Sequence, residues 1–251
     1  GPPDPDEQGA PPNLPRPSAI LPSGSDPGGG EQEVVITTLA KNLEIPWGIA
    51  FLPDGAALVT ERDTGRILQV GPESDANGLK VTEVQRLNEV RASGEGGLLG
   101  IAVSPKYQAD KSVFVYYSTA KDNRIAKLVL KGTPQPILTG LPRAAGANGG
   151  QLAFGPDGYL YATTGDGTSG GALAPNPKSL GGKILRMTTA GKPAPGNPVK
   201  DSLVWSSGHR NVQGIAWDKT KRMYASENSQ KRFGELNVID KGRNYGWPRA
   251  D

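Results

Sequence analysis

The sequence predicts an all-β fold, a β-propeller of four-stranded blades, and three observations lead to this prediction. The chain has 251 residues with 35 glycines and 23 prolines, a content of turn-forming residues that argues against a helical bundle. From residue 34 onward, short apolar runs alternate with turn clusters. One strand–turn–strand phrase then recurs four times, which is the pattern of repeated sheets around an axis.

Each copy of the phrase combines an apolar strand, a Pro/Asp/Gly turn and a second strand. The four copies cover residues 48–61, 100–117, 151–163 and 214–227, and their central alanines are Ala50, Ala102, Ala153 and Ala216. A further alternating run follows three of them, at residues 66–70, 124–130 and 183–187. Three or four strands per repeat favour a propeller over a solenoid, and a sandwich would not repeat its turns so regularly.

The turn residues have a physical role in this pattern. Pro53-Asp54-Gly55 and Pro156-Asp157-Gly158 each supply a fixed φ, a capping side chain and a residue that accepts positive φ. The small alanine in mid-strand is expected to let the inner strands crowd around the axis. At ~45 residues per blade, residues 32–251 predict about five blades.

Composition excludes several classes of function. The net charge of +3 is spread along the chain without a Lys/Arg block, so no nucleic-acid partner is expected. The absence of cysteine excludes disulfides, thiolate metal sites and cysteine nucleophiles. No apolar run approaches the ~20 residues that span a bilayer. The chain does not begin with Met, which is typical of a processed form or an expressed fragment.

Residues 1–31 have a different composition from the remainder, rich in Pro, Gly, Ser and acidic residues. Such a segment buries too little apolar surface to offset its ordering entropy, so we predict a disordered tether before a propeller domain at 32–251. In an exported protein this tether would separate a removed N-terminal membrane anchor from the folded domain. The alternative is a retained tail without a role.

Several sequence blocks resemble one family, the soluble quinoprotein glucose/sorbosone and aldose sugar dehydrogenases. The resemblance covers roughly residues 40–248 and rests on the blocks at residues 45–51, 94–100, 146–158, 164–166, 179–186, 208–214, 235–237 and 242–248. It implies an exported six-bladed propeller that binds pyrroloquinoline quinone (PQQ) and calcium at its mouth. The implied reaction oxidises an aldose sugar to a lactone and passes electrons to an external acceptor. The C-terminal part of the family domain is expected to be missing here.

The resemblance assigns the catalytic positions and shows one departure. Ala147 occupies the position of the family's histidine base, and Asp166 matches the acid that orients this histidine. A methyl group cannot accept a proton, so we predict that oxidation is impaired in this chain. His209 is the single histidine of the chain, and we expect it to be a surface or supporting residue rather than a replacement base.

The resemblance also implies ligands for the cofactor and the metal. The predicted cofactor-binding residues are Asn148, Arg210, Asn211, Glu95 and Asn228. An arginine is suited to this role because a planar guanidinium pairs with a carboxylate at two points. The predicted calcium ligands are Ser229, Gln230, Glu227 and Glu235, the first two through main-chain carbonyls.

Two further functions remain open from the sequence. The chain could be a non-catalytic propeller that binds a ligand, a glycan or a protein partner at the blade mouth, because propellers support many functions. A calcium-dependent lactonase-like hydrolase would need several convergent carboxylates around one metal, and the sequence contains few candidates. No Ser/His/Asp set or phosphate-binding loop has the necessary motif context.

Overall fold

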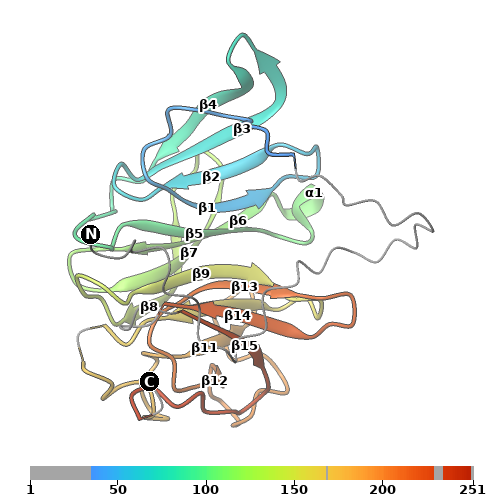
Figure 1. Cartoon of the computed structure of the whole chain (residues 1–251). Helices are drawn as coiled ribbons and strands as arrows, with labels where there is room; N and C mark the ends of the chain where they lie inside the picture. Colours follow the sequence, from blue (N-terminus) through green and yellow to red (C-terminus); the bar gives the residue numbers. More distant parts are fainter. Residues whose placement is uncertain (1–34, 168, 229–233, 250–251) are drawn as a thin grey trace, which may run out of the picture. The chain divides into compact units, whose positions relative to one another are not determined.

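The computed structural model describes residues 35–167, 169–228 and 234–249 (Figure 1). The predicted tether at residues 1–31 lies outside this range. Residues Thr38–Asp251 form one compact unit, and the regular elements of its described part are all strands except one four-residue helix, which confirms the all-β prediction. Within the described residues, no helix has the length and apolar character that a membrane crossing requires.

The strands form four antiparallel sheets in chain order. The first sheet contains β1 (Pro46–Phe51), β2 (Ala57–Glu61), β3 (Arg66–Asp75) and β4 (Gly78–Arg86). The second contains β5 (Leu98–Val103), β6 (Ser112–Ser118), β7 (Asn123–Val129) and β8 (Gln135–Leu141), with the short helix α1 (Tyr107–Asp110) before β6. The third contains β9 (Gly149–Phe154), β10 (Leu160–Thr164), β11 (Ile184–Met187) and β12 (Val204–Ser206). The fourth contains β13 (Val212–Trp217), β14 (Met223–Glu227) and β15 (Glu235–Ile239).

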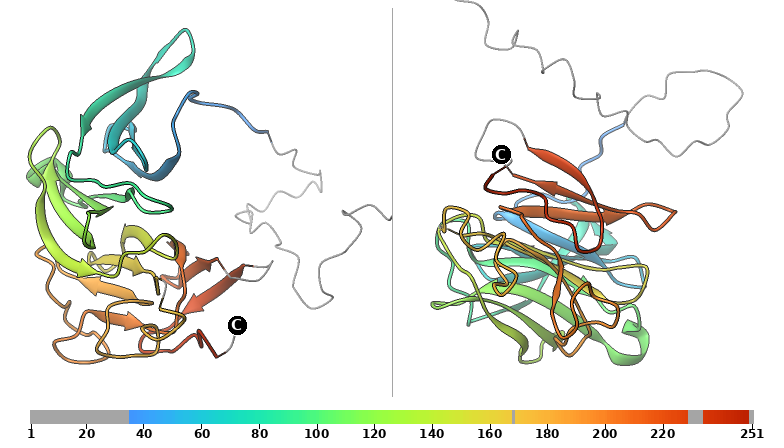
Figure 2. Two further views of the ribbon diagram at one scale, coloured as in Figure 1. Left: turned by 90° about the vertical axis from the view of Figure 1, so that its left-hand side faces the viewer. Right: turned by 90° about the horizontal axis from the view of Figure 1, so that it is seen from below.

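The first strand of each sheet contacts the first strand of the next, so that β1, β5, β9 and β13 follow one another in space (Figures 1 and 2). This succession of sheets is the blade arrangement of a propeller and matches the four recurring phrases of the sequence. The described residues contain four sheets instead of the expected five. The repeats are longer than ~45 residues, because the β3–β4 hairpin and the long connection between β10 and β11 take up additional chain.

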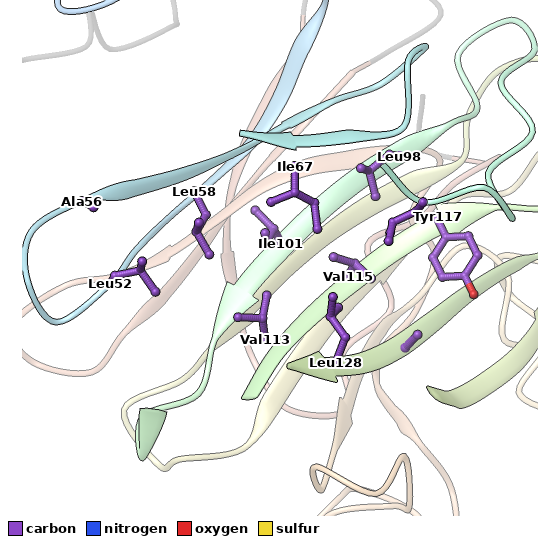
Figure 3. Packing of buried hydrophobic residues seen from close by; sticks show 12 residues of the cluster. Leu52, Ala56, Leu58, Ile67, Leu98, Ile101, Val113, Val115, Tyr117 and Leu128 are labelled. Carbon is purple, nitrogen blue, oxygen red and sulfur yellow. The ribbon is translucent and has the colours of Figure 1, made fainter. Parts of the chain in front are cut away.

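Apolar side chains from neighbouring sheets pack between the blades. Between the first two sheets, Leu58 and Ile67 meet Leu98, Ile101 and Val115, all fully or almost fully buried (Figure 3). A second cluster around Phe114, Tyr116 and Leu185 fills the space between the second and third sheets. Burial of these side chains is the main stabilising contribution that holds successive blades face to face.

Close approach of the inner strands depends on glycine, which corrects the role expected for the recurring alanines. A Cβ atom on Gly48 would lie 2.7 Å from the carbonyl oxygen of Leu99 in the next blade, and one on Gly100 would collide with the carbonyl of Gly150. Ala216, in contrast, is exposed. The glycine two residues before the alanine is therefore the position where a side chain cannot be accommodated in the first two blades.

Hydroxyl groups on the second strands connect neighbouring blades. The Thr163 hydroxyl accepts a hydrogen bond from the backbone N–H of Gln151 (3.0 Å) and donates one to the carbonyl of Val212 in the next blade (2.8 Å). In the first blade, the Thr60 hydroxyl makes the same pair of contacts with Gly48 (2.9 Å) and Leu99 (2.6 Å). Both threonines are fully buried, so the partners of each hydroxyl have no water to replace it.

We expect Thr163→Val to lower the free energy of unfolding by ~1–3 kcal/mol for each buried partner left without a hydrogen bond. Valine keeps the shape of threonine but removes the hydroxyl, whereas the control Thr163→Ser retains it. Urea denaturation of the three proteins measures the effect. A valine variant as stable as the wild type would contradict this role for the hydroxyl.

Candidate functional site

One edge of the sheets collects the residues that the sequence singles out. Because β1 and β2 run antiparallel, and likewise the first two strands of the other blades, the start of each inner strand and the end of its neighbour lie at the same edge. We call this edge the mouth, and its mouth loops are the segment 142–148 before β9, the loop after β10 and the segment 207–211 before β13. Ala147, Asn148, Asp166 and Arg210 all lie on these loops.

The mouth loops are hydrogen-bonded to one another, which confirms that the Asn148, Asp166 and Arg210 regions converge. Three bonds make this connection: Gly167 N–H to the Ala147 carbonyl (3.0 Å), Asp166 N–H to the Arg210 carbonyl (2.9 Å), and Gly149 N–H to Asn211 Oδ1 (3.0 Å). A side chain on Gly165 would collide with the Ala147 carbonyl. The loops before β9 and after β10 therefore approach as closely as their backbones allow.

Asp166 is the anchor of the mouth. Its side chain is almost fully buried, with a relative exposure of 1%. One carboxylate oxygen accepts hydrogen bonds from the Gly171 N–H (2.7 Å) and the Trp247 indole N–H (2.9 Å), and the other accepts from the Ser169 hydroxyl. With three donors in place, this buried carboxylate holds the loop after β10.

Lys183 lies close to Asp166, and the sequence analysis did not single it out. Its ammonium group is fully buried and donates to the carbonyls of Leu173 (2.9 Å), Ala174 (2.9 Å) and Gly181 (2.8 Å). Burial lowers the pKa of Lys183 to about 8, and the negative charge of Asp166 opposes this shift. The ammonium group thus links three carbonyls of the connection between β10 and β11 and holds this connection in place.

Arg210 presents its guanidinium group at the mouth. Its backbone N–H is fixed by Glu227 Oε2 (2.8 Å), and its Nη1 donates to the carbonyl of Asn228 (3.3 Å). The guanidinium also lies over the Trp247 ring, 5.7 Å from its centroid. Trp247 lies in the sequence block 242–248, to which no role was assigned from the sequence. It therefore positions both Asp166 and Arg210.

His209 is buried at the base of the mouth, not at the surface. Its Nε2 lies 2.8 Å from the Ser206 hydroxyl, its Nδ1 lies 3.1 Å from Glu227 Oε1, and its ring stacks on Tyr245. Its relative exposure is 0%. A histidine in this environment supports the neighbouring loop and cannot reach a substrate, which agrees with the supporting role expected for it.

The predicted metal ligands are only partly described. Both oxygens of Glu227 are engaged by His209 and by the Arg210 backbone, so a cation there would compete with these bonds. Glu235 is opposite Glu227 in the ladder but is exposed, and it accepts a bond from Asn237 (3.1 Å). Ser229 and Gln230 lie outside the described residues. In the described part of the chain, no three His, Cys, Asp or Glu residues form a group able to hold a metal ion.

The asparagines of the site make bonds within the protein. Asn148 is buried, and its Oδ1 accepts from Asn123 Nδ2 and from the Ala144 N–H, both at 3.0 Å. Asn211 Oδ1 accepts from Gly149, as described above. The Asn228 side chain is exposed and donates to Gln213 Oε1 (2.6 Å). Asn148 and Asn211 therefore shape the mouth loops, whereas Asn228 lies where a ligand can reach it.

Glu95 and Ala147 lie on facing segments of the mouth. The Glu95 N–H donates to the Ala145 carbonyl (2.8 Å), and its Oε2 lies 3.1 Å from the point where a Cβ on Gly146 would be. Glu95 is exposed, whereas Ala147 is buried and has a positive φ of 51°. Because Gly146 has no side chain, the Glu95 carboxylate can lie directly beside its backbone.

The site has donors suited to an anionic ligand. Besides Arg210, Arg143 on the segment before β9 has a buried Nε with no hydrogen-bond partner among the described residues. A buried donor without a partner is unfavourable, and an acceptor such as a ligand carboxylate would satisfy it. The residues present therefore fit a cofactor with several carboxylates, as PQQ has.

Comparison with known proteins identifies the family. Residues 43–251 match the family described as Glucose / Sorbosone dehydrogenase. The chain belongs to this family.

Its relatives in the glucose/sorbosone dehydrogenase family include proteins of known structure. The PQQ-bound aldose sugar dehydrogenase of Streptomyces coelicolor is 48% identical, with a TM-score of 0.82 over 87% of this chain and 66% of that one. Quinoprotein glucose dehydrogenase B of Acinetobacter calcoaceticus is 30% identical over 88% of this chain. The chain spans 52% of the length of that relative.

The buried Lys183 predicts a pH dependence of stability. Its pKa of about 8 in the folded protein lies below the ~10.4 of an unfolded lysine, so the unfolded chain binds more protons between these values. Stability therefore rises with pH across this window, and below it lysine is protonated in both states. We expect the free energy of unfolding of the wild type, minus that of Lys183→Met, to increase by on the order of 2 kcal/mol from the lower to the upper end of the window.

Urea denaturation at several pH values from 7 to 10 measures this difference. The methionine variant also loses three hydrogen bonds, so only the change of the difference with pH reports the titration. A difference that stays constant with pH would contradict a lowered pKa.

Proposed function

We propose that this chain oxidises aldose sugars to lactones, with PQQ as bound cofactor and an external acceptor that takes up the electrons. Two observations on the mouth loops carry the proposal: Arg210 and the exposed Asn228 lie in contact, and Arg143 has a buried Nε without a partner among the described residues. Membership of the glucose/sorbosone dehydrogenase family supports it. The structure of the PQQ-bound aldose sugar dehydrogenase of Streptomyces coelicolor supports the choice of cofactor.

The residues of the mouth would divide this work. The Arg210 guanidinium, 5.7 Å from the Trp247 ring centroid, would pair with a cofactor carboxylate at two points. Asp166 would keep Trp247 and the loop after β10 in place during binding. When bound, PQQ supplies the quinone that accepts hydride from the sugar carbon. The protein's own part is to bind, to orient and to remove the hydroxyl proton.

Calcium is part of the proposal. The loop after β14, which contains Ser229 and Gln230, would hold it through main-chain carbonyls, and a cation there would polarise a cofactor oxygen. Main-chain ligands do not depend on side-chain identity, and this is compatible with the absence of a carboxylate cluster in the described residues.

A non-catalytic binding propeller is the alternative, and one observation favours it. The position of the expected base carries the buried methyl group of Ala147. In that case the mouth would still bind PQQ or another anionic ligand but would not oxidise sugar. Turnover by the PQQ-loaded protein therefore separates the two functions. Export and a membrane tether are also proposed, on the composition of residues 1–31.

We expect the protein to bind PQQ with a 1:1 stoichiometry, and Arg210→Lys to weaken this binding by ~10-fold or more because a lysine cannot pair at two points. Isothermal calorimetry measures the affinity, and dye reduction with aldoses measures turnover. Arg222→Lys is the matched control, since Arg222 is exposed at the opposite edge of the sheets. Equal affinities for the two variants would contradict the role of Arg210.

A further inference from the structure

Oxidation of a sugar hydroxyl needs a proton acceptor, and the buried groups near Ala147 are unsuited to this role. Asp166 has a relative exposure of 1%, and three donors occupy its carboxylate. Both ring nitrogens of His209 are engaged by Ser206 and Glu227, and the ring is fully buried. These groups maintain the loops around the mouth and are out of reach of a substrate.

Glu95 differs from Asp166 and His209 in both exposure and hydrogen bonding. It is exposed, and no hydrogen bond or ion pair from the described residues reaches its carboxylate. Its backbone is fixed against the facing segment, because its N–H is bonded to the Ala145 carbonyl and a side chain on Gly94 would collide with the same carbonyl. The carboxylate lies beside Gly146, where a Cβ would be 3.1 Å from Oε2.

The Glu95 carboxylate lies beside Gly146, which is followed in the chain by another small residue, Ala147. A Cβ at residue 146 would press on Oε2, so a side chain there would displace the Glu95 carboxylate slightly. Arg143 and Arg210 supply positive charge at the same mouth, which offsets an acid next to an anionic cofactor.

We propose that Glu95 is the proton acceptor of sugar oxidation in this chain, in place of the histidine that Ala147 replaces; this rests on the proposed function. The Glu95 carboxylate takes the proton of the anomeric hydroxyl as the C–H bond of the same carbon breaks and its hydride passes to the quinone cofactor. The carbonyl of the lactone forms, the sugar loses two electrons, and the quinone gains them. Because Glu95 is exposed, it then releases the proton to water.

The test compares four proteins: wild type, Glu95→Gln, Ala147→His and the double variant, all saturated with PQQ and calcium. We expect Glu95→Gln to lower kcat by ~10²–10⁴-fold, because an amide has the shape of the acid without its basicity. In the Glu95→Gln background, Ala147→His should restore at least ~10²-fold of the loss. In the wild-type background the same substitution should change kcat by less than about tenfold.

Two controls keep the outcome clear. Glu89→Gln, at an exposed residue between β4 and β5, should leave kcat unchanged. PQQ affinity, measured by calorimetry on the apo variants, should be no weaker for Glu95→Gln than for wild type, because the substitution removes a negative charge beside an anionic cofactor; a lower kcat then reports a loss of chemistry and not of binding.

The possible failures are distinguishable. If wild type turns over sugar and Glu95→Gln keeps its kcat, Glu95 is not the base and the proposed function stands. The same conclusion follows if Ala147→His alone raises kcat by ~10²-fold or more, because the base would then have been missing. If PQQ-loaded wild type does not oxidise any aldose, the proposed function fails, and the role of Glu95 fails with it.

Discussion

The buried carboxylate of Asp166 is the interaction on which the mouth depends. It joins the loop after β10 to Trp247, a residue 81 positions away in the sequence, while its own backbone N–H is bonded to Arg210. A buried charge needs several donors to offset its desolvation, and here it has three, with Lys183 nearby. Because these groups come from three separate segments, they fix the relative positions of those segments.

This arrangement separates the support of the site from its chemistry. Asp166 and His209 are buried and hydrogen-bonded to other protein groups, and their environment is that of residues that maintain geometry. The polar side chains that a ligand can reach are at the mouth: the exposed Asn228 and Glu95, and the half-buried Arg210. The proposed role of Glu95 depends on this separation, because the proton acceptor can then differ while the buried groups that hold the loops stay the same.

Local features of the sequence predicted the fold well. The Pro-Asp-Gly turns and the apolar runs around them place the inner strands correctly, because turn chemistry and strand alternation act over a few residues. The number of blades was not predictable in the same way. The expected five became four within the described residues, since hairpin and loop lengths vary from repeat to repeat and no local rule sets them.

The site was predictable only where a motif marks it. Sequence motifs identified Asp166 and Arg210, and the structure brings them together. The burial of His209, the triple carbonyl contact of Lys183 and the double role of Trp247 depend on contacts between distant segments. The same holds for the glycines: whether Gly48 or Ala50 limits the approach of two blades is decided by the neighbouring strand.

The most direct measurement is a crystal structure of the protein with PQQ. The account predicts the cofactor at the mouth, with a carboxylate bonded to Arg210, the Asp166–Trp247 hydrogen bond retained and Glu95 facing the sugar site. Cofactor bound away from Arg210, or mouth loops that separate so that Asp166 loses Trp247, would contradict it.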